Sequence, residues 1–479
     1  MSYRLGAFAD VGLTQARLTT ALDEHGRSRL ARFERWWAYY RNALAPAHSG
    51  GRWYRQPQEV GLPGRLRGVQ PGGGLRDDRA GGQREIVIEN DIAWRVQAMV
   101  DFMFGKPVVI RSAAREALRP AVEHALSRVW GRSGGVALLQ DAALMGHVFG
   151  HVDLLVRVDE DAMARAALLV DKALPAAADA VRIEAVEPRR GVPVLSPHDF
   201  RRMDAYLIHA RTPGRDRSGE GLSLRAVLRA MSHGWEAGGE LLEVISPGAW
   251  HVYENGRLVW EQSRAWTGGA LPVVHIQNIS QPLEYEGLGE VEPLIPLQDE
   301  LNTRISDRAC RVTMQSFKMY LAKGIEGLTQ VGPGQVWHTD NTGASVESFG
   351  GDAHSPSEEA HIREVREALD KVSSVPPLSG GVVQGRIGNL SSATALRITL
   401  MGLSSKTARK RVTYGRGISD VCALVLAVLN TAGVLTTGPE DRAVTLEWPD
   451  PFPDDIRDTP APLRGTSDGT NTGGTQKGV

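Results

Sequence analysis

The chain has 479 residues, and its 55 Lys and Arg against 56 Asp and Glu give a formal net charge of −1. With 42% hydrophobic and 23% charged residues, it is predicted to fold into roughly two to four domains or one elongated chain of several parts. The longest apolar run, residues 421–429, is too short to span a bilayer, and residues 1–22 lack a signal-peptide pattern. We therefore expect neither a membrane protein nor a secreted one. Two cysteines exclude a disulfide framework.

The N-terminal part is predicted to be mainly helical. Apolar residues at three- to four-residue steps indicate one long amphipathic helix over residues 13–44, broken near Gly26. Residues 45–82 are rich in Gly, Pro and Arg and are typical of a loop or lid. A helix over 90–104 is capped by Asn90 and stopped by Gly105 and Pro107. Two further helices are predicted over residues 113–130 and 135–149.

Strands follow, with an exposed loop at residues 211–221. Asn255-Gly256 supplies the positive φ angles of a tight hairpin turn between two of them. Up to about residue 283 the pattern predicts an α+β domain with an antiparallel β portion. The predicted strands are residues 151–158, 181–186, 202–210, 241–245, 249–253, 257–261 and 273–277.

The second half begins with a helix that Pro293 and Pro296 can initiate, carrying an apolar stripe over about five turns. Three short strands, at 317–322, 335–338 and 345–349, precede a second helix, whose Ser355–Glu358 start fits a capping box. After an aperiodic stretch at 375–389, a long helix is predicted from Ser391 or Ser392 to about residue 432. Glycines at 402, 415 and 417 favour kinks in it. A strand at 444–448 and a Gly/Thr/Ser-rich disordered tail end the chain.

Signals for catalysis or metal binding are weak. His147 and His151 have the spacing of helical metal ligands, but Gly150 intervenes, which favours a helix-to-strand junction. Residues 380–387 are Gly-rich yet lack the Lys-Ser/Thr pair of a phosphate loop. Cys422 lies in an apolar run and is predicted to be a core residue. We therefore expect no catalytic residue, no metal and no cofactor.

A local concentration of positive charge stands out. Residues 371–419 contain eight basic and no acidic residues, whereas the following segment 440–458 has a net charge of −5. The basic segment could face nucleic-acid phosphate, or be a solvated helix face or partner for the acidic segment. Its position on a Gly-rich loop and the helix behind it favours duplex backbone contact. The eight residues are Lys371, Arg386, Arg397, Lys406, Arg409, Lys410, Arg411 and Arg416.

Aromatic residues form a second candidate surface near the N-terminus: Trp36, Trp37, Tyr39 and Tyr40. Aromatic side chains dominate burial in cores and interfaces, so core packing with a half-exposed edge is favoured over a binding surface.

Several short motifs, in order along the chain, resemble the portal (connector) proteins of tailed bacteriophages and gene-transfer particles. No motif is specific by itself; their order, together with the pattern helix, small β module, helix, loop and long helix, carries the resemblance. The motifs are WAYYRN at 37–42, FMFGKP at 102–107 after Asn90, LPVVHIQN at 271–278, GLGE at 287–290 with LQDELN at 297–302 and Ser306-Asp307, and SSATALR at 391–397.

The resemblance implies a subunit of a ring, commonly of twelve copies. Residues 1–283 and 391–459 would form the wing and a rudimentary crown, and 287–316 and 355–374 two stem helices. Residues 317–354 would be the clip, 375–390 the tunnel loop and 460–479 the disordered tail. The family often has helical crown segments after the last wing strand, and only about thirty residues follow Trp448 here. The crown is therefore expected to be absent or rudimentary.

By the same resemblance, the ring would be a channel for double-stranded DNA, bound without sequence specificity, in packaging and ejection. The implied partners are a terminase motor, major capsid and scaffolding proteins and a head-tail adaptor, in the virion and, during assembly, the host cytoplasm. The expected channel residues are Arg386, Arg397, Lys406, Arg409, Lys410 and Arg411, with Gly380, Gly381, Gln384, Gly385, Gly388 and Asn389 in the tunnel loop. The alternatives are a nuclease or packaging ATPase, and a helical interaction scaffold that forms no ring.

Overall fold

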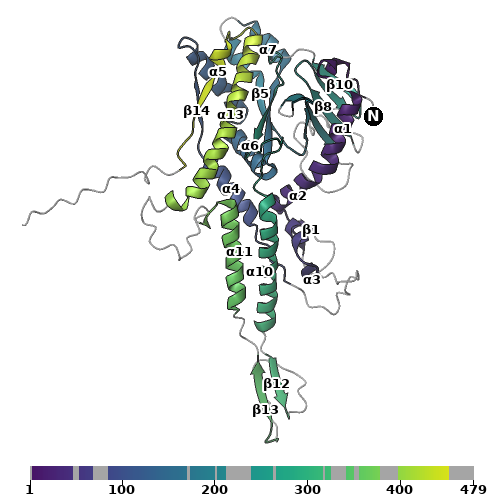
Figure 1. Ribbon diagram of the computed structural model, residues 1–479, viewed down its shortest axis with the longest axis vertical. Helices are drawn as coiled ribbons and strands as arrows, with labels where there is room; N and C mark the ends of the chain where they lie inside the picture. Colours follow the sequence, from purple (N-terminus) through teal and green to yellow (C-terminus); the bar gives the residue numbers. More distant parts are fainter. Residues whose placement is uncertain are drawn as a thin grey trace, which may run out of the picture.

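A broad α+β body carries a two-helix hairpin, and a small two-stranded module lies at the far end of that hairpin (Figure 1). The computed structural model describes residues 3–46, 53–67, 85–169, 173–199, 202–211, 239–262, 266–316, 319–324, 341–349, 355–377 and 397–451. Helices and antiparallel strands both occur in the body, which confirms the α+β prediction. The hairpin and its distal module give the molecule an elongated shape.

The predicted N-terminal helix is present and is broken where expected. α1 (Gln15–Glu24) and α2 (Leu30–Arg41) are joined by a π-helical turn, η2 (His25–Arg29), which includes Gly26. The aromatic residues of α2 are core residues: Trp36, Tyr39 and Tyr40 are buried. The region expected to be a loop, 45–82, contains short elements where it is described: β1 (Ala45–Pro46), β2 (Tyr54–Arg55), η3 (Pro57–Gly61) and α3 (Gly64–Arg67).

Helices α4 (Asp91–Phe104) and α6 (Val136–Phe149) lie where they were predicted. The Asn90 side chain accepts a hydrogen bond from the Ala93 amide and caps α4, as expected. The helix predicted at 113–130 begins later, as α5 (Arg119–Arg132). The residues before it form β3 (Val109–Ser112), which pairs with β14 (Val444–Glu447), a strand more than 300 residues away in the sequence. The sequence around β3 does not predict this strand, because the strand with which it pairs is distant in the sequence.

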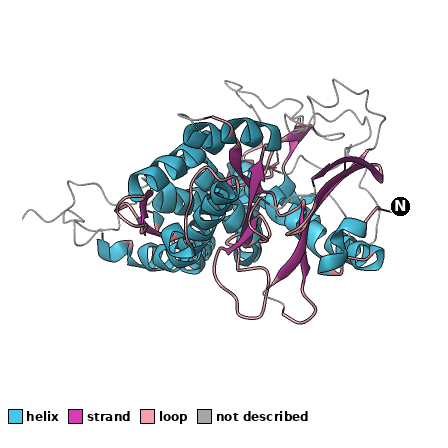
Figure 2. Ribbon diagram, turned by 90° about the horizontal axis from the view of Figure 1, so that it is seen from above, coloured by secondary structure: helices cyan, strands magenta, loops and turns pink. Residues whose placement is uncertain are grey.

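Two antiparallel sheets form the centre of the body. One has the order β11 (Val273–Gln277), β4 (His151–Val158), β5 (Val181–Val186). The other has the order β10 (Arg257–Gln262), β9 (Trp250–Glu254), β8 (Glu240–Ile245), β7 (Met203–Arg211), β6 (Gly191–Leu195). Asn255 and Gly256 have the predicted positive φ angles, 51° and 80°. Figure 2 shows these strands lying between helices on both sides. The sequence prediction missed β6, α7 (Glu160–Ala167) and α8 (Ala173–Asp179).

The projecting hairpin consists of α10 (Ile295–Ser316) and α11 (Pro356–Ser373), with β12 (Met319–Lys323) and β13 (Ser345–Phe349) paired beyond it (Figure 1). The strand predicted at 335–338 lies outside the described residues. Pro356 is at the start of α11 as predicted, but the Ser355 side chain makes no capping hydrogen bond. Glu358 instead forms an ion pair with Arg311 of α10, so it links the two helices.

The long helix α13 (Met401–Thr431) continues through all three glycines without interruption. A Cβ at Gly417 would lie 2.4 Å from Ile276 Cγ1 of β11, whereas one at Gly415 would make only ordinary contact with Trp448, at 3.6 Å. Gly417 therefore allows β11 to pack closely on α13. Gly433, with φ of 72°, ends the helix as expected. α13 is long and apolar enough to cross a membrane, but 56% of its most apolar window is buried inside the fold, as in a core helix. Cys422 is fully buried there, as predicted.

A buried polar network joins the two sheets at Asp153 of β4. Its carboxylate accepts hydrogen bonds from the hydroxyl groups of Tyr206 (2.7 Å) and Tyr285 (2.8 Å) and lies 2.7 Å from Nδ1 of His275. Burial alone would raise the pKa of Asp153, but His275, His151 and the Tyr206 hydroxyl outweigh it and lower the pKa to about 2. The ionised carboxylate is therefore part of the native fold.

This network predicts acid sensitivity of the body. The pKa of an aspartate in an unfolded chain is about 4, higher than the pKa of Asp153 in the folded protein. The ionised Asp153 carboxylate therefore stabilises the fold fully above about pH 4. The contribution should disappear as the pH falls from about 4 to about 2, and amounts to roughly 2–3 kcal/mol. Urea unfolding between pH 5 and 2 measures it. Asp153→Asn should lower stability at pH 5 and flatten the pH dependence; an unchanged pH slope would contradict the assignment.

Candidate nucleic-acid interface

The structure describes only part of the predicted basic surface. Arg386 and the expected tunnel-loop residues lie outside the described residues, as does the predicted helix start at 391–392. Residues 397–399 are helical, and Leu400 is a turn before α13. The remaining cations lie on the N-terminal half of α13 and at the end of α11, where the hairpin joins the body (Figure 1).

Two of the expected channel residues bind the fold itself. The Nζ of Lys406 lies 2.5 Å from Oε2 of Glu290 and donates to the Ser373 carbonyl at 3.0 Å. The Nζ of Lys410 lies 2.7 Å from Oε1 of the same glutamate. Lys410 is only 2% exposed and Glu290 is also 2% exposed. Lys410 therefore cannot contact a DNA phosphate in this conformation, because its ammonium group is buried and paired.

The electrostatics of this site agree with a structural role. Burial alone would raise the pKa of Glu290, but Lys410 and Lys406 outweigh it and lower the pKa to about 2. Burial lowers the pKa of Lys410 to about 8, against the opposing effect of Glu290. Glu290 precedes α10, and Ser373 ends α11, so Lys406 and Lys410 fix both ends of the hairpin to α13.

A second buried cation supports the same junction. Arg95 of α4 is 3% exposed and forms an ion pair with Asp370 of α11 at 2.8 Å. It also donates to the Ser373 hydroxyl at 3.1 Å and to the Val375 carbonyl at 2.9 Å. The sequence prediction missed Arg95 as well as the role of Glu290. A charged residue in the middle of an apolar helical pattern was the available signal for Arg95, since buried arginines are nearly always paired.

The other cations divide into paired and exposed groups. Arg411 lies over the Trp448 ring, 5.2 Å from its centroid, and donates to the Pro449 carbonyl at 3.0 Å. Arg409, Arg416 and Lys371 are exposed. Arg416 has a weak contact with Asp420 at 4.0 Å, and neither Arg409 nor Lys371 has an acidic partner within the described part of the chain. Arg397 is half-buried.

No group of three or more His, Cys, Asp or Glu suited to a metal lies among the described residues. His147 is fully buried; its Nδ1 lies 2.6 Å from the Ala143 carbonyl, and burial lowers its pKa to about 3. It lies at the end of α6, directly before β4, which agrees with the helix-to-strand junction expected from the sequence.

Comparison with known proteins decides the family. The family described as "Phage portal protein, SPP1 Gp6-like" matches residues 87–461, most of the chain. The chain belongs to this portal protein family. Its predicted resemblance to portal proteins is thereby confirmed. Members of the family are structural components of phage heads, so this portal protein is assigned to the virion. No curated protein matches the sequence.

Among solved structures, the portal protein is similar to a chain described as "Virion of native gene transfer agent (GTA) particle". The two chains are 14% identical, and the TM-score is 0.41. The similarity covers 75% of this chain and 80% of the other.

Proposed function

We propose that this portal protein assembles into a ring at one vertex of a capsid and forms the channel through which double-stranded DNA is packaged and ejected. Family membership carries the proposal, and the shape of the subunit supports it. The body would be the wing, α10 and α11 the stem, and the module of β12 and β13 the clip. The ring would also be the docking platform for a terminase motor and for tail or adaptor proteins.

The buried ion pairs suit a subunit that transmits force. A stem that joins a body through flexible loops would bend when DNA moves through the ring. Here Glu290, Lys406, Arg95 and Asp370 fix both stem helices to α13 and α4 through contacts of 2.5–2.8 Å. We infer that the stem and wing move as one body.

For DNA contact, the proposal keeps Arg386, Arg397 and Arg409 and adds Arg416. It drops Lys406, Lys410 and Arg411, which are bound within the subunit. Of the four, Arg409 and Arg416 are exposed in the described part of the chain, and exposed arginines attract the phosphate backbone without reading base sequence. A conduit needs this combination, because base-specific contacts would hold the DNA in one register.

The mass of the purified full-length protein tests the ring. Twelve subunits of 52.0 kDa would give a particle of about 620 kDa by light scattering. A monomer or dimer at micromolar concentration would contradict the proposal and favour a scaffold without a ring. A nuclease would instead require metal-dependent cleavage of plasmid DNA, and incubation with Mg²⁺ or Mn²⁺ separates that alternative.

A further inference from the structure

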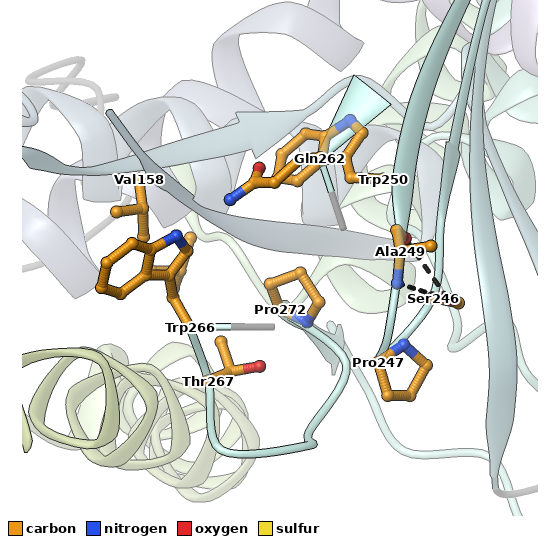
Figure 3. Close-up of a pocket in the computed structure, with 10 residues that line it drawn as sticks. Val158, Ser246, Pro247, Ala249, Trp250, Gln262, Trp266, Thr267 and Pro272 are labelled. Atoms are coloured by element: carbon orange, nitrogen blue, oxygen red, sulfur yellow. Dashed lines mark hydrogen bonds between the residues drawn. The ribbon is translucent and has the colours of Figure 1, made fainter. Parts of the chain in front are cut away.

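The pocket between β4, the β8–β9 hairpin and the segment leading into β11 is too small for a ligand (Figure 3). Its space of about 30 Å³ holds one or two water molecules. The guanidinium of Arg157 covers the Trp250 ring in its wall, 4.8 Å from the ring centroid. Two features of the molecular surface, in contrast, have no role in the proposed channel and are large enough to bind a protein.

The first is the loop between β11 and α10, which holds an exposed leucine in a strained conformation. Leu283 is 77% exposed and has a φ of 68°, in the left-handed region that leucine rarely adopts. The Gln277 side chain fixes this loop, because its Nε2 donates to the carbonyls of Glu284 (2.8 Å) and Tyr285 (3.2 Å). Its Oε1 accepts a hydrogen bond from the Gln281 amide at 3.1 Å. An apolar side chain held rigidly in solvent despite backbone strain indicates a contact surface.

The chemistry of this loop is apolar with one negative charge. Pro282 and Leu288 are exposed in the same loop as Leu283. Glu284 directly follows Leu283 and is exposed, and its carboxylate has no ion-pair partner within the described part of the chain. A partner surface should therefore be apolar and carry positive charge.

The second feature has this chemistry and lies where α2 leads into β1 and β2. Trp53 is 92% exposed, and Leu44 and Tyr54 are exposed beside it on the β1–β2 pair. We call these three residues the Trp53 patch. Two exposed arginines adjoin it in the sequence, Arg41 at the end of α2 and Arg55 in β2, and neither has an acidic partner among the described residues. Exposed apolar patches with a polar rim are typical of protein–protein contacts.

The loop and the Trp53 patch lie on opposite sides of α2. Glu286 of the loop forms ion pairs with Arg29 and Arg32, so the loop lies against that side of the helix. Arg41 follows Arg32 by nine residues, which is two and a half turns, and therefore points the opposite way. Both surfaces lie near the junction of hairpin and body, since the loop leads into α10 and β1 lies beside α10 (Figure 1). Their positions favour contact between copies rather than within one subunit.

We propose that the Leu283 loop of one copy packs on the Trp53 patch of the next copy. This inference rests on the proposed ring and names a contact that closes it. Pro282 and Leu283 would cover the exposed indole, and Glu284 would pair with Arg41 or Arg55. Contact of two loops, or of two patches, would bring like charges together, whereas the head-to-tail contact brings opposite charges together. Head-to-tail contacts form rings when the rotation between copies closes.

A substitution that relieves the strain separates the contact from the fold. Asparagine adopts the left-handed region more readily than leucine, so Leu283→Asn should keep or raise the melting temperature. It should nevertheless raise the protein concentration needed for assembly about tenfold or more, because the apolar contact is lost. Light scattering over a concentration series measures assembly. The control is Leu168→Asn, at an 84% exposed leucine after α7, which should assemble normally. Normal assembly of Leu283→Asn would overturn the proposal.

Charge reversal tests the ion pair. Glu284→Arg should weaken assembly, and so should the double variant Arg41→Glu, Arg55→Glu, because each brings like charges together. The combined triple variant should recover assembly, because both sides of the contact are then reversed. Weakening without recovery would contradict the pairing of Glu284 with these arginines.

A mixing experiment distinguishes failure of this contact from failure of the ring. Leu283→Asn chains keep an intact Trp53 patch, and Trp53→Ser chains keep an intact loop. Their equimolar mixture should therefore stop at dimers of about 104 kDa, twice 52.0 kDa. Dimers in the mixture, with no closed ring from the unsubstituted chain, would contradict the proposed function and retain this contact. Rings that form equally well with either variant alone would overturn the contact and retain the function.

Discussion

Replacing Glu290 by leucine is expected to lower the free energy of unfolding by about 3–5 kcal/mol. The substitution leaves the ammonium groups of Lys406 and Lys410 without their shared carboxylate, and Lys410 is only 2% exposed. Breaking a buried pair costs more than the pair contributes, because the remaining charge stays desolvated. Denaturant unfolding of the full-length protein, followed by circular dichroism, measures the loss.

Two further variants separate this effect from a general loss of charge. Glu292→Leu removes an exposed carboxylate two residues away and should change stability by less than about 0.5 kcal/mol. The double variant Glu290→Leu, Lys410→Met removes the most buried cation as well and should recover part of the loss. A Glu290→Leu protein as stable as Glu292→Leu would show that the junction does not depend on this ion pair.

Replacing Arg409 by glutamate is expected to impair DNA packaging while ring assembly is retained. Arg409 is exposed on α13, so the substitution costs little stability and reverses one charge per subunit, repeated around the ring. Binding to duplex DNA should weaken equally for all sequences, and the slope of log K against log salt should become shallower by about 0.9 for each phosphate that Arg409 no longer neutralises. Packaging is measured as nuclease-protected DNA in assembled heads.

The control for Arg409→Glu is Arg27→Glu, which reverses the charge of an exposed arginine near the N-terminus. If the Arg409→Glu protein packages as much DNA as the Arg27→Glu protein, Arg409 does not contact DNA in the channel. Lys406→Glu is unsuitable for this test, because it places a second carboxylate beside Glu290 and disrupts the stem junction. A defect in that variant would not report on DNA contact.

Elements with local signals were predictable from the sequence. Asn90 and Gly105 gave the two ends of α4, and Asn255-Gly256 gave the β9–β10 turn. β6 was missed because Pro193 interrupts it, and a proline argues against a central strand. The structure explains its tolerance, since β6 is at the edge of the five-stranded sheet. β3 was missed because the strand with which it pairs, β14, lies at the other end of the chain.

The candidate DNA surface was less predictable, because counting charges along the sequence ignores partners that are distant in it. The basic segment has no acidic residue within it, yet Glu290, more than 100 residues earlier, neutralises much of the charge of Lys406 and Lys410. Arg411 is likewise held by Trp448 and Pro449. The basic residues that remain exposed on α13 are Arg409 and Arg416. They form a smaller positive surface than the sequence suggested.

The central claim is that copies of this chain form a ring around a DNA channel. Electron microscopy of the purified full-length protein tests it most directly. The account predicts closed rings with a central opening wide enough for duplex DNA, with the α10–α11 stem surrounding the opening and the wing on the outside. Globular particles without an opening, or open filaments, at concentrations where the protein is folded would contradict it.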